Sequence, residues 1–571
     1  MKNQRSAFCR IHSICSKILL GLTVSLLTFT ASAEGKYMVS AANPHAAKAG
    51  QEILAKGGSA VDAAIAIQMV LTLVEPQSSG IGGGAFMLFY DKGSKSITTF
   101  DGREKAPAAV TPDYFLKEDG TKLKFYEAVV GGKAVGVPGV LAMLEKAHQK
   151  YGKLPWKDLF SAAITLSEEG FEISPRLHYL LDRDKFLKTK AIAADYFYNT
   201  DGSAKPVGTV LTNPELAATL TLIAEKGSQG FYKGAIAEDI VKAVANDAKN
   251  PGLLNLQDLA TYESKERTPV CILYRTNKVC GMGPPTSGGL TSLQILKLLE
   301  RYPLGSLKPL STKSIHLIAE ASALAFADRG LFMADEDFVS FPKEGLLSAA
   351  YTARRSSLIQ DGQTNIPYSA GDPDKAGYDL SPDQAIELPS TSHFSVVDQE
   401  GNAVSMTTSV ENVFGSRLMV RGFILNNQLT DFSFLPEKAG QLINNRIEPG
   451  KRPRSSMSPT IVLDEQDQLR LVIGSPGGSR IIGYVTKTLI ANLDWGLSIQ
   501  EAINLPHFIN RNGTLDLEED TQLGTLQEAL EKLGHKVKLR SLNSGLHGIE
   551  VVQGELRGGA DPRREGVVLG N

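Results

Sequence analysis

Cysteine and tryptophan are scarce in this chain, and its opposite charges nearly cancel. The 571 residues include four Cys and two Trp, and 60 Lys and Arg are matched by 62 Asp and Glu, which leaves a formal net charge of −2. A nucleic-acid-binding domain usually carries a pronounced excess of basic residues on one face. The charge balance therefore gives no support to a nucleic-acid partner, and we expect none.

The motifs predict neither a metal site nor a nucleotide cofactor. No pair among the nine His and four Cys shows the spacing typical of metal ligands. The glycines at 80–84 lead into a strand-like run, whereas a dinucleotide-binding loop leaves a strand and begins a helix. The glycines at 474–478 do connect a strand to a helix, but they lack the Lys-Ser or Lys-Thr ending of a nucleoside-triphosphate loop. We expect no cofactor.

Long apolar runs are also missing, apart from one near the start. Residues 18–29 are apolar but short for a membrane span, follow four basic residues and end in Ala-Ser-Ala at 31–33. This pattern predicts a secretory signal peptide over residues 1–33 with cleavage before Glu34; an uncleaved signal anchor is the alternative. The apolar stretch 60–74 contains two polar side chains and predicts a buried helix. We expect an exported protein, periplasmic or secreted, with no membrane span after signal cleavage.

Two cysteines remain once the signal peptide is removed. Cys271 and Cys280 lie in two strand-like runs on either side of a short turn at 275–276. Folding this segment as a hairpin places the two residues opposite each other, so a disulfide is geometrically possible in an oxidising compartment. Two buried free thiols fit the pattern equally well, and both alternatives stay open.

Helical patterns dominate the first two thirds of the chain, and strands dominate the rest. From 362 to 389 the chain is polar and rich in Asp, Pro, Ser and Gly, which predicts a surface loop or a disordered segment. Helices covering sheets in one α/β body fit this order of elements. The predicted helices span 45–56, 140–151, 214–225, 236–244, 286–300 and 479–489. The predicted strands span 85–90, 96–100, 393–398, 403–409, 460–463 and 469–474.

Thr391 begins a strand directly after the polar segment. If the chain is cut before Thr391, this residue supplies a hydroxyl nucleophile and an α-amine with a pKa of roughly 8 that can take the hydroxyl proton. Backbone N–H groups at Gly477 and Gly478 can form an oxyanion hole, in which one donor is worth roughly 3 kcal/mol. The alternatives are ordinary turn residues around Ser390 and a tight strand-to-helix turn at the glycines.

Eight motifs in order along the chain carry a resemblance to a known family. They are GSAVDAA at 58–64, EPQSSGIGGG at 75–84, DGREKAP at 101–107, PPTSGG at 284–289, TSHFS at 391–395, NNQ at 426–428, RPRSSMSP at 452–459 and GSPGG at 474–478. In these motifs the chain resembles the bacterial γ-glutamyltransferases, or γ-glutamyltranspeptidases, of the N-terminal-nucleophile hydrolase superfamily. The resemblance extends over nearly the whole chain after the signal peptide.

The resemblance implies a fold, a processing event and a reaction. The fold is a four-layer αββα sandwich. The precursor cuts itself between Ser390 and Thr391 into a large subunit, 34–390, and a small catalytic subunit, 391–571, which stay together as a heterodimer. Thr391 then attacks a γ-glutamyl amide such as glutathione, Gly477 and Gly478 hold the oxyanion, and water, an amino acid or a dipeptide accepts the acyl group.

The resemblance also indicates which residues bind the two charged groups on the donor's α-carbon. The α-carboxylate is expected at Arg103, because a planar guanidinium can bind two oxygens, with the hydroxyls of Ser455 and Ser456 assisting. Relatives often have a second Thr where this chain has Ser409. Ser409 keeps the hydroxyl and with it the auxiliary role beside Thr391.

The α-ammonium is expected at Asp431 together with Glu411 and Gln428. Glu411 stands where several relatives have Asn, and an extra carboxylate favours a cationic amine. The region 434–450, which corresponds to the active-site lid, is shorter than in enterobacterial relatives. His393 belongs to a motif but is expected to be a packed strand residue without a catalytic role.

Two other functions fit parts of the same pattern. Cephalosporin acylases share many of these motifs, but their glutaryl donor lacks the α-amine that Asp431 would bind, so the full set of Arg103, Asp431, Ser455 and Ser456 argues against this function. The second alternative is an unprocessed, inactive chain that serves as a binding protein. The presence of Thr391 argues against it.

Overall fold

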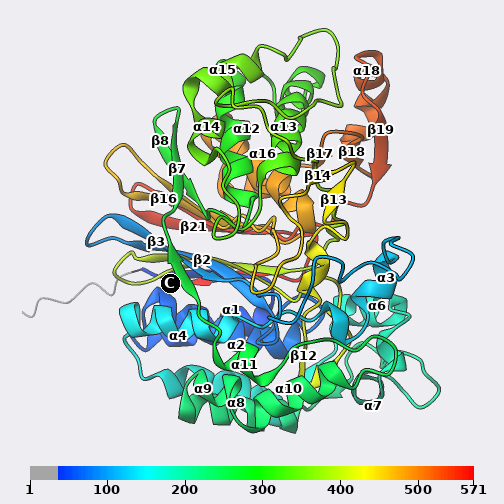
Figure 1. Ribbon diagram of the computed structural model, residues 1–571. Coiled ribbons are helices and arrows are strands. Elements are labelled where there is room, and N and C mark those ends of the chain that lie inside the picture. The colour runs from blue at the N-terminus through cyan, green and yellow to red at the C-terminus, as the bar shows by residue number, and fades with distance from the viewer. Residues whose placement is uncertain (1–35) are drawn as a thin grey trace, which may run out of the picture. The chain divides into compact units, whose positions relative to one another are not determined.

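Two stacked antiparallel sheets form the centre of the protein (Figure 1). The computed structural model describes residues 36–571, so the predicted signal peptide lies outside the described residues. One sheet has seven strands in the order β22-β1-β9-β10-β2-β3-β6, and the other has six in the order β21-β20-β16-β15-β8-β7. Within residues 36–571 no helix combines the length and apolarity needed to cross a bilayer.

The strands of both sheets are short and mostly buried. The seven-stranded sheet comprises β1 (Met38–Ala41), β2 (Gly84–Asp91), β3 (Ser96–Gly102), β6 (Lys265–Arg267), β9 (Ser392–Val397), β10 (Ala403–Ser409) and β22 (Val567–Gly570). The six-stranded sheet comprises β7 (Val270–Tyr274), β8 (Asn277–Gly281), β15 (Thr460–Leu463), β16 (Leu469–Gly474), β20 (His547–Val552) and β21 (Glu555–Ala560).

A layer of helices covers the outer face of each sheet, so the protein has four layers, αββα (Figure 1). The helices on the seven-stranded sheet include α1 (Pro44–Ala55), α2 (Ala60–Val74), α4 (Val140–Tyr151), α5 (Ser161–Glu169), α8 (Pro214–Lys226) and α10 (Ala235–Ala245). Those on the six-stranded sheet include α12 (Gly288–Leu299), α13 (Thr312–Phe332), α15 (Ala349–Ser356) and α16 (Ile481–Leu493). A three-stranded sheet, β17 (Phe508–Asn510), β18 (Leu515–Glu518) and β19 (Val537–Arg540), packs beside them with α18 (Gln527–Lys532).

Helix α2 shows how the sequence specifies this arrangement. Every residue from Ala60 to Val74 is buried, as expected for an apolar helix between a sheet and other helices. It begins with a capping box, in which Ser59 and Asp62 each accept a hydrogen bond from the other's backbone N–H. The helix predicted over 60–74 is confirmed.

The strand that follows Thr391 is buried on both faces. Phe394 and Val396 on β9 pack among the helices of the first layer. On the opposite face, Ser395 donates to the carbonyl of His547 at 3.0 Å, and His393 lies 2.8 Å from the Thr407 hydroxyl. Polar side chains between the sheets therefore bond to each other, as buried polar groups require. His393 is a packed strand residue, as its sequence context predicts.

The polar segment 362–389 contains no helix and no strand, but its last part is not a free surface loop. Between 381 and 388 its residues alternate between exposed and inward-facing positions, as an extended chain does when one side lies against the protein. The segment is therefore a surface loop, one of the two predicted alternatives, and its last residues have one side against the protein.

The hairpin of β7 and β8 lies at the edge of the six-stranded sheet. Its register places Cys271 directly opposite Cys280, and the structure joins them in a disulfide. The turn contains Arg275 in a left-handed conformation at φ 55°, and its guanidinium donates to Asp494 at 2.9 Å. Of the two alternatives left open by the sequence, the structure contains the disulfide.

We expect no reactive thiol in the mature protein when it is unfolded without a reductant. Cys271→Ser should expose one thiol and lower the free energy of unfolding by up to about 3 kcal/mol, because the bond closes a loop of roughly ten residues. Titration with a thiol reagent in denaturant, with and without prior reduction, measures this. Two free thiols in the unreduced wild-type protein would contradict it.

Candidate active site

Thr391 lies in a buried, strained turn immediately before β9. The residue is 5% exposed and has φ 89°, a conformation that β-branched residues rarely adopt. Its Oγ1 lies 3.0 Å from the Oγ of Ser409, the last residue of β10. Because Ser409 Oγ already accepts from the Glu411 N–H at 2.8 Å, its own proton is free to be donated to Thr391.

An arginine holds the backbone of the same turn. Arg564 donates from Nη1 to the Thr391 carbonyl at 2.9 Å. The side chain is buried, and burial lowers the pKa of its guanidinium to about 9. The group stays protonated at neutral pH and fixes the direction of the Thr391–Ser392 peptide, next to the Ser390–Thr391 peptide, which is intact in this structure.

The glycine turn after β16 supplies a hydrogen-bond donor to that peptide. The Gly477 N–H donates to the Ser390 carbonyl at 3.1 Å, so it polarises the carbonyl of the Ser390–Thr391 peptide. Gly477 and Gly478 have φ 135° and 60°, and a Cβ on Gly478 would lie 2.6 Å from the Leu388 carbonyl. Both positions therefore require glycine.

Nine of the ten residues predicted for catalysis and donor binding line one small cavity. Its volume is about 20 Å³, which holds one water molecule and no glutamyl group. The tenth residue, Gly477, contacts Ser390 as described. The nine are Arg103, Thr391, Ser409, Glu411, Gln428, Asp431, Ser455, Ser456 and Gly478.

The two residues predicted to bind opposite charges of a donor are paired with each other. Arg103 Nη2 lies 2.5 Å from Asp431 Oδ2, and Gln428 donates to the same oxygen at 2.9 Å. Burial raises the pKa of Asp431 to about 6, although Arg103 opposes the shift. Arg103 also donates to the carbonyls of Pro453 and Arg454, at 3.1 and 3.0 Å. A donor molecule must therefore exchange its own charges for an existing ion pair.

Two further carboxyl groups near this pair have raised pKa values, which favours their neutral forms. Burial raises the pKa of Glu104, whose Oε2 lies 3.6 Å from Arg103 Nη1, to about 8. Burial and the charge of Asp431 raise the pKa of Glu411 well above its usual range. The charge of Arg103 is therefore balanced mainly by Asp431, and a cationic amine placed beside Glu411 would lower the pKa of Glu411 again.

The segment before Thr391 fills the space where a donor would bind. The carboxylate of Glu387 accepts hydrogen bonds from Arg329 and Ser456, and Arg454 Nη2 lies 3.4 Å away. Burial alone would raise the pKa of Glu387, but the two guanidinium groups bring it down to about 2. Farther upstream, Asp383 forms a buried salt bridge to Arg454 at 2.7 Å.

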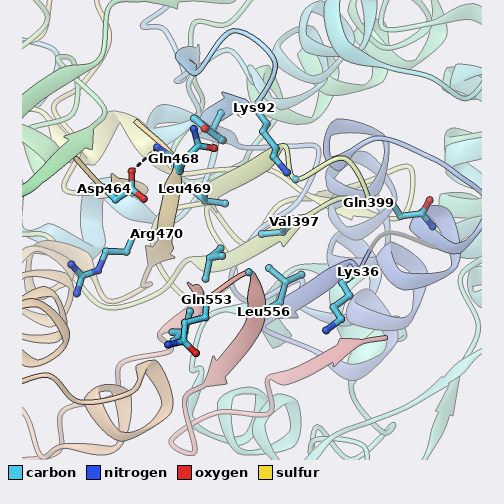
Figure 2. Close-up of a pocket in the computed structure, with 15 residues that line it drawn as sticks. Lys36, Lys92, Val397, Gln399, Asp464, Gln468, Leu469, Arg470, Gln553 and Leu556 are labelled. Carbon is cyan, nitrogen blue, oxygen red and sulfur yellow. Dashed lines mark hydrogen bonds between the residues drawn. The ribbon is translucent and has the colours of Figure 1, made fainter. Parts of the chain in front are cut away.

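A larger cavity, of about 720 Å³, lies elsewhere (Figure 2). It is bounded by Val397 at the far end of β9, so it is roughly 20 Å from Thr391 at about 3.3 Å per strand residue. Lys92, Asp464 and Arg470 line it, and none of the predicted site residues does. The predicted residues therefore line the smaller of these two cavities. The candidate site is identified by the chemistry of its side chains and not by its volume.

A model of the Gamma-glutamyltranspeptidase family matches residues 46–571. The chain belongs to this family. The glutathione hydrolase proenzyme of Bacillus subtilis strain 168 is 37% identical over 544 residues, which cover 93% of this chain and 91% of that protein. The glutathione hydrolase proenzyme of Escherichia coli strain K12 is 37% identical over 538 residues, 92% of this chain and 90% of that protein.

The fold agrees with membership of the γ-glutamyltranspeptidase family. The crystal structure of cephalosporin acylase from Bacillus halodurans matches with a TM-score of 0.81 and 27% identity, over 94% of this chain and 96% of that one. The predicted αββα sandwich of the N-terminal-nucleophile hydrolases is confirmed, and the protein is an enzyme of this family.

Four residues of this γ-glutamyltranspeptidase site were missed by the sequence analysis. Arg329, Arg454 and Glu387 form the buried charge cluster, and Arg564 holds the nucleophile's carbonyl. Arg454 lies in the motif at 452–459, where it was given no role, and Glu387 lies in the segment predicted to be a surface loop or disordered. Arg329 could have been found from the sequence, because it is a charged residue near the end of α13, a helix whose residues are mostly buried.

We expect Glu387→Ala to slow cleavage of the chain before Thr391 by at least tenfold. Removing the carboxylate leaves Arg329 and Arg454 partly unpaired and frees the segment that holds Ser390 against Gly477. Denaturing gels of freshly folded protein, sampled over time, give the rate. Glu387→Gln tests whether charge or shape matters, and Ile386→Ala, at a side chain 50% exposed, is the matched control. Equal rates for Glu387→Ala and Ile386→Ala would contradict the anchoring role.

Proposed function

We propose that this protein is a self-processing γ-glutamyltransferase that also hydrolyses glutathione. The observation that carries the proposal is the convergence of predicted residues from both sides of Thr391 on one cavity beside its hydroxyl. The predicted large and small subunits, 34–390 and 391–571, both contribute strands to each sheet, so they would remain together after cleavage.

Self-cleavage begins with the Thr391 hydroxyl. Its oxygen bonds to the Ser390 carbonyl carbon, the hydroxyl proton passes to the peptide nitrogen, and the C–N bond breaks to give an ester. The Gly477 N–H stabilises the negative charge that develops on the carbonyl oxygen. Water then hydrolyses the ester, which leaves a carboxylate on Ser390 and a free α-amine on Thr391.

The free amine then serves as the base for turnover. It takes the proton of the Thr391 hydroxyl as this oxygen attacks the γ-amide of a donor such as glutathione. The N–H groups of Gly477 and Gly478 stabilise the oxyanion, and the amine product leaves. Water, an amino acid or a dipeptide attacks the γ-glutamyl ester, which gives hydrolysis or transfer according to the acceptor.

Donor recognition requires the self-cleaved segment to leave its place. The donor's α-carboxylate replaces Glu387 near Ser456 and pairs with Arg103 and Ser455. Its α-ammonium binds Asp431, Gln428 and an ionised Glu411. A glutaryl group has the carboxylate but no ammonium, so its binding would leave Asp431 without a new cationic partner, which disfavours the acylase alternative.

The predicted signal peptide supports export to the periplasm or the medium. The disulfide between Cys271 and Cys280 supports the same location, because disulfides persist in oxidising compartments. No cofactor takes part in the proposed reaction.

We expect Thr391→Ala to remain a single uncut chain without activity, because the nucleophile for both reactions is gone. Thr391→Ser is the matched control: it keeps the hydroxyl and should be cut, at a reduced rate. Denaturing gels and mass spectrometry of the new N-terminus measure both. Efficient cleavage of Thr391→Ala before residue 391 would overturn the nucleophile assignment, whereas a wild-type chain that stays intact and inactive would favour the unprocessed binding protein.

The purified enzyme should prefer a γ-glutamyl anilide to the matching glutaryl anilide by roughly 30-fold or more in kcat/KM. Leaving buried charged groups without partners costs about 2 to 5 kcal/mol, and roughly 30-fold corresponds to about 2 kcal/mol. Asp431→Asn should reduce the ratio of the two kcat/KM values, because only the γ-glutamyl donor carries an ammonium group that Asp431 can bind. Equal rates, or a glutaryl preference, would assign the protein to the acylases.

A further inference from the structure

Two histidines and a glutamate meet in the helical layer over the six-stranded sheet. His316 and Glu320 lie one turn apart on α13, and His535 follows α18. His316 Nδ1 lies 2.8 Å from His535 Nε2, and one potential ligand atom from each residue lies within 4.8 Å of the others. All three residues are buried, and none of them lines the active-site cavity.

The hydrogen bonds of His316 leave one ring nitrogen free to bind a metal. Its Nε2 lies 2.7 Å from the Gln360 carbonyl, which can only accept, so Nε2 carries the proton. The lone pair is then on Nδ1 and points to His535. Metal-binding histidines commonly donate their other N–H to a backbone carbonyl in this way.

Glu320 lacks a cationic partner. Its carboxylate accepts from the hydroxyls of Thr364 and Tyr368, each at 2.5 Å, and lies 3.5 Å from the Asn365 N–H. All three donors are neutral, and within residues 36–571 this buried carboxylate forms no salt bridge. A buried negative charge without a counter-ion is costly, and a cation between Glu320 and the two imidazoles would compensate it.

We propose that His316, Glu320 and His535 bind a divalent transition-metal ion of the zinc type. Two imidazoles and one carboxylate form a known three-ligand set for zinc, with water in the fourth position. Tetrahedral ligands about 2.0–2.2 Å from the ion lie about 3.3 Å apart, so the widest pair must close by about 1.5 Å. The proton between the rings moves to His535 Nδ1, which frees its Nε2 as a ligand.

The site joins segments that are far apart in the chain. His316 and His535 are 219 positions apart, on opposite sides of the proposed cleavage point. If the chain is cut before Thr391, the ion would link the large and small subunits without a covalent bond. Binding itself does not depend on cleavage, so the uncut Thr391→Ala chain should bind the metal as well.

Zinc binding to untagged protein tests the proposal. We expect about one zinc ion per chain by elemental analysis after dialysis from excess zinc, and a midpoint of thermal unfolding several degrees higher in zinc than in EDTA. His535→Gln and Glu320→Gln should lose at least 90% of the bound zinc and all of the thermal shift. His178→Gln, whose ring bonds to the Lys205 carbonyl away from the cluster, is the matched control and should bind as the wild type does.

Cobalt(II) provides a second readout that does not depend on stability. Bound to two imidazoles and a carboxylate in tetrahedral geometry, it should give intense visible absorption in the wild type and in His178→Gln, and none in Glu320→Gln. Less than 0.1 zinc per chain in the wild type would overturn the proposal. Equal zinc content in the wild type and His535→Gln would overturn it too, because the ion would then be elsewhere.

Discussion

The hydrogen bond from the Gly477 N–H to the Ser390 carbonyl is the contact on which the rest of the site depends. Gly477 follows a strand of the six-stranded sheet, and Ser390 precedes a strand of the seven-stranded sheet. The bond therefore fixes the proposed nucleophile, at the start of a strand in one sheet, against the proposed oxyanion donor after a strand of the other. The stacking of two sheets, with hydroxyl groups of one bonded to carbonyls of the other, makes this alignment rigid.

The charges around this contact are satisfied in the uncut chain without a substrate. Arg103 is paired with Asp431, and Glu387 binds Arg329 and Ser456. Both arrangements use groups that can also bind the charges of an α-amino acid. The precursor is therefore stable and closed, and opening the cavity requires the segment that carries Glu387 to be released. Cleavage before Thr391 provides that release, because it frees one end of the segment.

Much of the fold could be predicted from local patterns in the sequence. The helix at 60–74 was predicted to the residue because its apolar run begins at a capping box and stops just before Pro76. The strand around His393 and the glycine turn at 477–478 were also predicted correctly. The helix predicted from 479 begins instead with a 3₁₀ turn, because the chain must first bring the Gly477 N–H to Ser390. This contact joins segments that are distant in the chain, so the local sequence pattern does not predict it.

The sequence by itself determined the family and predicted which residues gather around Thr391, because these lie in contiguous motifs whose chemistry can be recognised one segment at a time. Only the tertiary structure decided how distant charges pair. It placed Glu387 against Arg329, closed the disulfide at Cys271, and brought His535 to a helix more than two hundred residues away. These contacts depend on the packing of the layers, and spacing along the chain carries no record of which buried charges meet across them.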